Sequence, residues 1–334
     1  MALWVGSASA EVPAGPRLTF MEAGDAGFKM ISADPGGGDQ QVIAGGNVTR
    51  RLLPYPFNRP NWSGDGTHVV FTGLKRSGER AVFDIYEVAA DGTEITRLPG
   101  TRNGFDAVLS PDGHMLAFSR QREREAGKPR RGKATDYRSA SIWLLNLDRG
   151  TVIQLTPWRN ELFAFPSSFS PDGSTLAITR QRRQSRAAVA IRLDGSGETV
   201  LAQNAGDPVY SPDGSRLAMI TIGKRRTIGR KGESLTFSPT ELAVAAADGS
   251  GLTGLTRTRS LELMPSWDPS GQRIAYTLIS PVLGEASFLG AGDSIMEVNA
   301  DGSCRTKVLS VPGVTLYGAT WQPGPGREAG SISC

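Results

Sequence analysis

The sequence predicts an all-β fold assembled from repeated four-stranded antiparallel units. Three observations point to it: a short motif recurs along the chain, turn residues stand at regular intervals, and no stretch has a sustained helical period. Glycine (41 residues) and proline (21) are abundant, as is typical of a chain with many tight turns. Apolar residues make up 39% of the 334, enough for a packed core.

The recurring motif is a Pro-Asp-Gly turn followed by a short apolar strand. The copies read NWSGDGTHVVFTG from Asn61, LSPDGHMLAFSR from Leu109, FSPDGSTLAITR from Phe169, YSPDGSRLAMIT from Tyr210 and SWDPSGQRIAYTL from Ser266, with a last fragment TWQPG from Thr320. The turn prolines are residues 111, 171, 212, 269 and 323, and Gly64 takes this place in the first copy. After a variable loop, each complete copy continues with a third strand, a second tight turn such as Asp248-Gly249, and a fourth strand.

The Ser-Pro-Asp-Gly-x-x-(Leu/Ile)-Ala cores and the closing TWQPG resemble the TolB-like family of WD40-like β-propeller repeats. The resemblance implies a propeller that acts as an interaction platform in the bacterial cell envelope. Five complete copies, three N-terminal strands (RLTFME, FKMISAD and QQVIAG) and the last fragment predict a six-bladed β-propeller of four-stranded antiparallel blades. Its sixth blade would be closed by N- and C-terminal strands. We expect residues 11–325 to form this single propeller and residues 326–334 a C-terminal tail.

The N-terminus and the cysteines bear on the compartment. Residues 1–10 end in Ala8-Ser9-Ala10 and resemble the remnant of a signal peptide, although the basic leader is missing; an ordinary apolar N-terminus is the alternative. In an exported protein Cys304 and Cys334 would form a disulfide, and otherwise two free thiols. We expect an extracytoplasmic protein, periplasmic or secreted, and a cytoplasmic one if residues 1–10 are no signal remnant. No run of about 18 apolar residues predicts a membrane span.

The turn residues are expected to shape hairpins rather than to carry chemistry. Asp112, Asp172 and Asp213 recur at one turn position, where a carboxylate accepts hydrogen bonds from nearby backbone amides. His68 and His114 are the only histidines and belong to different copies, so a catalytic triad or a multi-histidine metal site is poorly supported. The glycine-rich DPGGGDQ from Asp34 joins two strands and is expected to be a hairpin loop. We expect no catalytic residue, no metal site and no cofactor.

The loops between the second and third strands are basic and should emerge on one face of the ring, because the strands of a blade are antiparallel. With residues of the first copy they contain 20 of the 37 Lys and Arg residues, whereas the corresponding loop of the fifth copy, LISPVLGEASFLGAGDS, is apolar and nearly uncharged. This face is predicted to bind a partner; the alternative is a set of solvated loops. The candidate binding residues are Arg122, Arg124, Arg130, Arg131, Lys133, Arg182, Arg183, Arg186, Lys224, Arg225 and Arg226.

Three functions remain open from the sequence. The favoured one is a non-enzymatic exported scaffold, monomeric, that binds a protein partner or an anionic cell-envelope polymer on the basic face. The alternative is a propeller-type enzyme, resembling a polysaccharide lyase or a hydrolase-associated propeller, that acts on an acidic substrate. Nucleic-acid binding is not expected, because Tyr137 is the only aromatic residue in the three main basic loops and base stacking would have little support.

Overall fold

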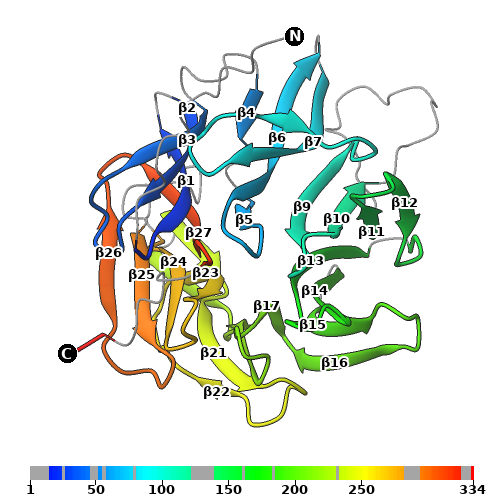
Figure 1. The fold of residues 1–334 in the computed structure, drawn as a ribbon. Coiled ribbons are helices and arrows are strands. Elements are labelled where there is room, and N and C mark those ends of the chain that lie inside the picture. Colours follow the sequence, from blue (N-terminus) through cyan, green and yellow to red (C-terminus); the bar gives the residue numbers. More distant parts are fainter. Residues whose placement is uncertain are drawn as a thin grey trace.

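The chain folds into antiparallel sheets arranged as a ring around a central axis, a β-propeller arrangement (Figure 1). The computed structural model describes residues 15–24, 27–45, 52–54, 58–77, 80–121, 139–159, 162–182, 185–230, 233–281, 294–324 and 332–334. All regular elements in these ranges are strands. Among the described residues, no helix has the length and apolarity to cross a membrane.

One sheet joins the two ends of the ring. Its order is β27 (Thr315–Trp321), β1 (Leu18–Gly24), β2 (Gly27–Ala33) and β3 (Gln41–Gly45). β1 and β27 are antiparallel, with Leu18 opposite Trp321 and Ala23 opposite Thr315. The C-terminal strand is therefore the inner strand of a sheet whose other three strands are N-terminal, as the sequence predicts, and this pairing leaves no open edge between the ends of the chain.

The next sheet along the chain contains β4 (Leu52–Pro54), β5 (Asn61–Trp62), β6 (His68–Ser77), β7 (Arg80–Ala89) and β8 (Thr96–Arg97). β4 and β5 both pair with β6, which continues to β7 and β8. Two four-stranded groups follow in one continuous sheet: β9 (Gly104–Leu109), β10 (Met115–Gln121), β11 (Ala140–Asn146), β12 (Thr151–Gln154), and β13 (Phe163–Phe169), β14 (Thr175–Arg182), β15 (Ser185–Arg192), β16 (Glu198–Gln203). A single parallel pair, Ala140 with Phe163, connects them.

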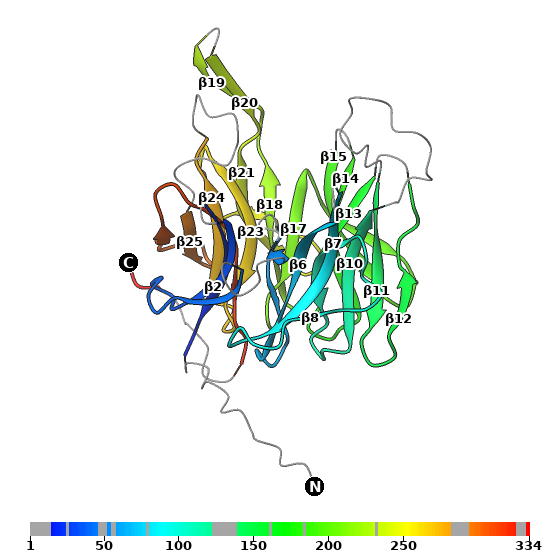
Figure 2. The same ribbon diagram turned by 90° about the horizontal axis from the view of Figure 1, so that it is seen from above.

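Two further four-stranded sheets complete the ring. One contains β17 (Ala205–Tyr210), β18 (Arg216–Ile222), β21 (Thr240–Ala246) and β22 (Thr253–Gly254), and the other β23 (Leu261–Trp267), β24 (Arg273–Ile279), β25 (Ser294–Asn299) and β26 (Thr306–Ser310). Between β18 and β21 the chain forms a separate hairpin of β19 (Arg226–Arg230) and β20 (Glu233–Phe237), which projects beyond the ring (Figure 2). The sequence indicated only a basic loop here, so this hairpin is an addition to the prediction.

The core lies between neighbouring sheets. The Leu-Ala or Ile-Ala pair after each Pro-Asp-Gly turn is fully buried; these residues are Leu116, Ala117, Leu176, Ala177, Leu217, Ala218, Ile274 and Ala275. One cluster shows the packing: Val108, Ala117 and Ile142 from one group of strands meet residues of the next group, such as Phe169 and Ile178. The small alanine lets the next sheet approach closely, and burial of the larger side chains drives the association.

The repeated aspartates shape turns, as predicted. Asp112 Oδ1 accepts hydrogen bonds from Ser110 Oγ (2.5 Å) and His114 N (3.1 Å). Asp172 and Asp213 make the equivalent pairs with the serines before and after them. These hydrogen bonds hold the pKa of Asp112 below its usual value and lower that of Asp213 to about 2. His114 Nδ1 lies 2.9 Å from Asp148 Oδ2 at the exposed surface.

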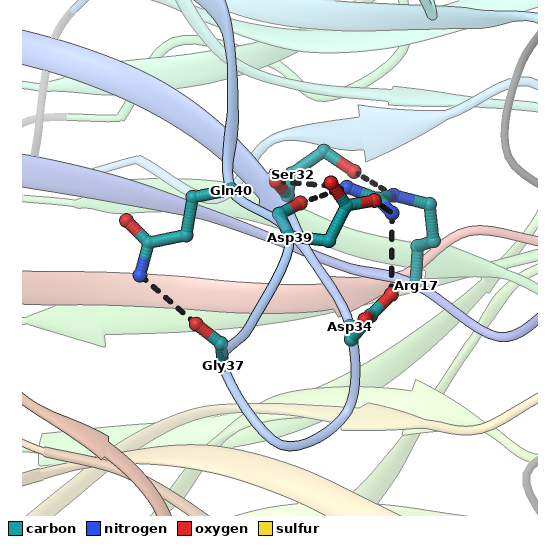
Figure 3. A network of polar contacts seen from close by, with 6 residues as sticks. All are labelled: Arg17, Ser32, Asp34, Gly37, Asp39 and Gln40. Carbon is teal, nitrogen blue, oxygen red and sulfur yellow. Dashed lines mark hydrogen bonds and ion pairs between the residues drawn. The ribbon is translucent and has the colours of Figure 1, made fainter.

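A buried arginine fastens the sheet that joins the two ends. Arg17 is 1% exposed and precedes β1. Its guanidinium donates to Ser32 Oγ (2.8 Å), Ser32 O (3.1 Å), Asp34 Oδ1 (3.3 Å), Asp39 Oδ2 (2.9 Å) and Asp39 O (2.7 Å) (Figure 3). The glycine-rich DPGGGDQ segment is thus a loop between β2 and β3, closed around one cation, and the expectation of a hairpin loop is confirmed.

The last described residues are attached to the turn between β25 and β26. Cys304 and Cys334 form a disulfide with 5.1 Å between their Cα atoms. Asn299 adds two hydrogen bonds to Ile332: its Nδ2 donates to the carbonyl (2.9 Å), and its Oδ1 accepts from the amide (2.7 Å). The described end of the tail therefore lies against the ring.

Candidate functional site: a charged axial cavity

Six residues occupy one equivalent position, five residues ahead of the turn proline, or of Gly64 in the first copy. They are Arg59, Asp106, Pro166, Asp207, Met264 and Gly318. Five of them line one cavity, and a Cβ atom on Gly318 would lie 3.3 Å from Met264 Sδ and 3.4 Å from Arg59 Cβ. Segments up to 259 residues apart, from Arg59 to Gly318, thus converge on the axis of the ring.

The backbone at this position is left-handed in four of the six copies. Asp106, Asp207, Met264 and Gly318 have φ angles of 51°, 52°, 55° and 62°, in the left-handed region that non-glycine residues seldom adopt. The ladders shift register here, for example between Gly206 and Val209, as in a β-bulge. Bulges redirect side chains, and conformations of this kind concentrate at functional sites.

Threonines of the preceding sheet hold three of these bulges. Thr72 Oγ1 accepts a hydrogen bond from Asp106 N (3.2 Å), Thr179 Oγ1 from Asp207 N (2.7 Å), and Thr277 Oγ1 from Gly318 N (3.0 Å). All three threonines are buried. The inner strand of one sheet is therefore positioned by the second strand of its neighbour.

The cavity has a volume of about 200 Å³. It combines charged groups from distant parts of the chain with apolar ones. Its lining residues are Arg59, Asn61, Asp106, Ala107, Val108, Phe165, Pro166, Ser167, Arg186, Asp207, Leu263 and Met264. Phe165 meets Phe105 edge to face, with 6.0 Å between the ring centroids, and stacks on Phe163 at 6.3 Å. Phe165 is the aromatic residue of the lining, and the other two rings support it from behind.

Asp207 is held by several partners. Arg186 Nη2 donates to Asp207 Oδ1 at 2.8 Å, Thr179 Oγ1 lies 3.4 Å from the same oxygen, and Met264 N donates to Oδ2 at 3.4 Å. Gly206 makes room for the arginine, since a Cβ atom there would collide with the Arg186 guanidinium. The Arg186–Asp207 pair is thus a fixed, mutually compensating part of the wall.

Asp106 and Arg59 differ from that pair. Within the described part of the chain, no residue donates a hydrogen bond to the Asp106 carboxylate. Burial, together with the charge of Asp207, raises the pKa of Asp106 to about 7, against the opposing effect of Arg59. Arg59 Nη1 donates to the Pro265 carbonyl at 2.6 Å, and burial lowers the pKa of Arg59 although Asp207 and Asp106 oppose this. The cavity contains a carboxyl group with a pKa of about 7 and, in the same lining, a half-buried guanidinium.

The basic residues expected on one face lie partly outside the described ranges: Arg122, Arg124, Arg130, Arg131, Lys133 and Arg183. Of the others, Arg182 is exposed at the end of β14, and Lys224, Arg225 and Arg226 are exposed at the base of the β19–β20 hairpin (Figure 2). We call these four residues the basic rim. Arg186, which we expected among the basic residues on this face, instead lines the cavity together with Asp207. Arg120, the first residue of the longest basic loop, packs over Trp143 at 4.3 Å from the ring centroid.

Arg186 connects the basic rim with the cavity, whose residues Asp106, Pro166, Asp207 and Met264 lie midway along the inner strands. β14 and β15 are antiparallel, with Arg182 opposite Ser185 at the end of the hairpin, and Arg186 is the next residue along β15. From there its side chain reaches the cavity. The Pro-Asp-Gly turns lie at the opposite end of the same strands. An approaching partner could therefore contact both features together.

The sequence reasoning did not single out Arg59, Asp106 or Asp207. A signal was present, because alignment of the repeats on the turn proline places an Arg and two Asp where the other copies have Pro, Met or Gly. Among the described residues, no group of three or more His, Cys, Asp and Glu side chains is placed to hold a metal ion.

No family model matches the chain, and no curated protein matches it. Solved structures do. TolB from Acinetobacter baumannii superposes with a TM-score of 0.67 at 18% identity, over 94% of this chain and 68% of that one. A putative TolB from Agrobacterium tumefaciens gives 0.60 at 17% identity, over 92% and 99%. A chain of a nidogen/laminin complex gives 0.61 at 13% identity, over 92% and 98%. The chain thus has the fold of TolB-like β-propellers. Sequence identities this low support a shared fold and nothing about function.

Proposed function

We propose that this protein is a non-enzymatic, exported scaffold, a six-bladed propeller that binds an acidic protein partner over the basic rim and the axial cavity. The observation that carries the proposal is the lining of the cavity: Arg59 and Asp106 both line it, and Arg186 connects it with the ring end where exposed basic side chains emerge. A charged rim around a specific pocket is a common arrangement for steering and then selecting a partner.

The six-blade count rests on the equivalent positions around the axis. Five of the six lie within innermost strands and Arg59 lies just ahead of one; five of the six line one cavity, and Gly318 lies next to two of these. The long sheet from β9 to β16 counts as two blades, because its halves share a single parallel pair whereas the strands within each half pair along their length. The sheet of β27, β1, β2 and β3 is then the sixth blade.

Export is supported by the disulfide, since disulfides persist mainly in oxidising compartments. A purely binding role is supported by the histidines: His114 lies beside Asp148 and His68 Nδ1 lies 2.8 Å from Thr67 Oγ1, both next to turns away from the axial cavity. A protein partner is preferred over a polymer because the cavity combines Phe165 and other apolar side chains with a few charged groups, which suit one inserted side chain.

The test compares two sets of variants. In the rim variant Lys224, Arg225 and Arg226 are changed to Gln; in the control the exposed Arg149 and Arg192, at the turn end of the ring, are changed to Gln. Poly-L-glutamate is the acidic polypeptide probe, and polygalacturonate is the polymer probe. We expect the rim variant to lose about tenfold in affinity for poly-L-glutamate at low salt and the control to match the wild type.

Equal affinity of the rim variant and the wild type would contradict the proposal. Stronger binding of polygalacturonate than of poly-L-glutamate would shift the assignment to an anionic polymer. Mass spectrometry of the protein from its native host tests export independently: cleavage after Ala10 and an intact Cys304–Cys334 bond are expected.

A further inference from the structure

The charged groups of the axial cavity do not cancel, and their net charge indicates which kind of ligand the cavity binds. Asp207 and Arg186 compensate each other at 2.8 Å. Of the remaining pair, Arg59 is positively charged, whereas Asp106 is neutral below neutral pH because its pKa is raised to about 7. The cavity therefore carries about one positive charge at mildly acidic pH and is close to neutral at alkaline pH.

We propose that the cavity binds a single carboxylate of the partner between the Arg59 guanidinium and the carboxyl group of Asp106, both of which line it. This inference rests on the proposed function, because it names the group of the acidic partner that enters the ring. Both the side chain of Asp or Glu and a chain-terminal carboxylate have the required chemistry.

The guanidinium is suited to the task. The Pro265 carbonyl fixes Arg59 through one of its five N–H donors, with Nη1 to oxygen at 2.6 Å. A buried guanidinium gains from a nearby anion, since planar Arg–carboxylate hydrogen bonds are among the strongest in proteins. A protonated Asp106 would add an O–H donor to the same anion, in the way that pairs of close carboxyl groups retain one proton between them.

Only a few charged groups near Asp106 affect its pKa. Asp207 on β17 and Arg59 ahead of β5 are the charges that act on it. On strands that contact β9, Asp84 of β7 lies 3.6 Å from Arg97 of β8, and Arg120 of β10 donates to the Gly100 carbonyl. Lys75 on β6 is exposed. β13 brings only Phe165, Pro166 and Ser167 to the cavity, none of which titrates in this range.

The apolar lining of the cavity limits the kind of side chain or chain end on which the bound carboxylate is presented. Val108, Phe165, Leu263 and Met264 face the cavity, whose 200 Å³ is the share of about seven water molecules. A carboxylate on a short apolar stem fits both the volume and the lining. A cation is disfavoured, because it would pass the basic rim and then lie beside Arg59.

The experiment measures the affinity of small probes from pH 5.5 to 8.5 by NMR titration of the full chain. N-acetyl-leucine presents a terminal carboxylate, and N-acetylglutamic acid 1-amide presents a side-chain carboxylate; the two arms distinguish the sources. N-acetyl-leucine amide and N-acetylglutamine amide are the uncharged controls. We expect at least one acid to bind at least tenfold more tightly than its amide at pH 5.5.

The pH dependence is the decisive readout. Above the pKa of Asp106 the free protein must take up a proton to bind the anion, so affinity should stay constant below pH 7 and fall by up to tenfold per pH unit above it. Asp106→Asn keeps a donor without titrating, so it should retain the low-pH affinity within about threefold and lose the dependence. Asp148→Asn, an exposed carboxylate at the turn end, is the charge-matched control and should behave as the wild type.

Arg59→Met should lose the binding of both acids more than tenfold at every pH, with circular dichroism as the check that it folds. Affinity that is independent of pH in the wild type, affinity that rises with pH, or no difference between acids and amides would each overturn the inference. The two proposals can fail separately. If the rim variant loses affinity for poly-L-glutamate but the small probes bind independently of pH, only the proton-sharing carboxylate site is overturned. If the rim variant binds poly-L-glutamate as the wild type does but the probes show the expected pH dependence, only the binding role of the basic rim is overturned.

Discussion

Replacement of Arg17 by Met is expected to weaken the closure of the ring more than any surface change. The side chain is 1% exposed and donates five hydrogen bonds, two to Ser32 in β2 and three to Asp34 and Asp39 in the loop that joins β2 to β3. Methionine fills a similar volume but donates none of them. The loop would lose the cation around which Asp34 and Asp39 are arranged, and the start of β1 would lose its attachment to that loop.

The magnitude follows from the partners. At about 1 kcal/mol for each hydrogen bond the sum is about 5 kcal/mol. The two carboxylates are 52% and 56% exposed, so water can replace part of what they lose, and about 3 to 4 kcal/mol should remain. Arg17→Lys keeps the charge but reaches fewer acceptors, and about half of that loss is expected.

Urea unfolding followed by tryptophan fluorescence measures the effect. With a slope of about 3 kcal/mol per M for a chain of this size, the midpoint for Arg17→Met should fall by about 1 M. The exposed Arg149→Met is the matched control and should shift the midpoint very little. A loss below about 1 kcal/mol for Arg17→Met, or no loss for Arg17→Lys, would refute the reasoning that one cation organises the closure.

Three other changes test separate features. Gly318→Ala should cost roughly 2 to 3 kcal/mol in thermal unfolding, since φ is 62° and the new Cβ would lie 2.9 Å from Arg59 Cα; Gly313→Ala, also at positive φ but with open space, should cost only about 1 kcal/mol. Reduction of the Cys304–Cys334 disulfide, which closes a loop of sequence separation 30, should lower stability by about 3 kcal/mol without loss of the fold by circular dichroism. Asp106→Asn should equal the wild type in stability at pH 4 and exceed it at pH 8 by roughly 4 kcal/mol, at about 1.4 kcal/mol for each pKa unit. The folded pKa of about 7 lies above the unfolded value, so the wild type loses stability as pH rises between them. An unchanged difference across this range would contradict that pKa.

The repeat made much of the fold predictable. Each Pro-Asp-Gly turn marks the junction of two strands, and the Leu-Ala that follows must be buried, so strand order follows from the local pattern. The pairing of β27 with β1 could be inferred because the last fragment lacked three strands that the N-terminus could supply. The β19–β20 hairpin was not foreseen, because its residues between 226 and 237 carry basic and polar side chains that resemble a solvated loop.

The axial cavity was harder to predict, because its chemistry depends on contacts between copies of the repeat. Asp106 and Asp207 are 101 residues apart in the sequence. They become part of one site only because two bulges turn them toward the same axis. Arg186 shows the same limit. Within its own segment, Arg180 to Arg186, it is one of four arginines, and only the neighbouring Gly206 and Asp207 distinguish its role. Sequence patterns within one copy carry no information on such contacts.

The disulfide also decides how the ring would respond to mechanical tension. The start of β1 and the end of β27 lie side by side, so tension applied at Arg17 and Gln322 would open their ladder one hydrogen bond at a time, the weakest loading direction for paired strands. Tension applied at Cys334 follows a different covalent route, because the disulfide transfers the load to Cys304 and bypasses β26 and β27. The oxidation state of one bond therefore determines whether the force enters the sheet of β23 to β26 or the sheet that joins the two ends.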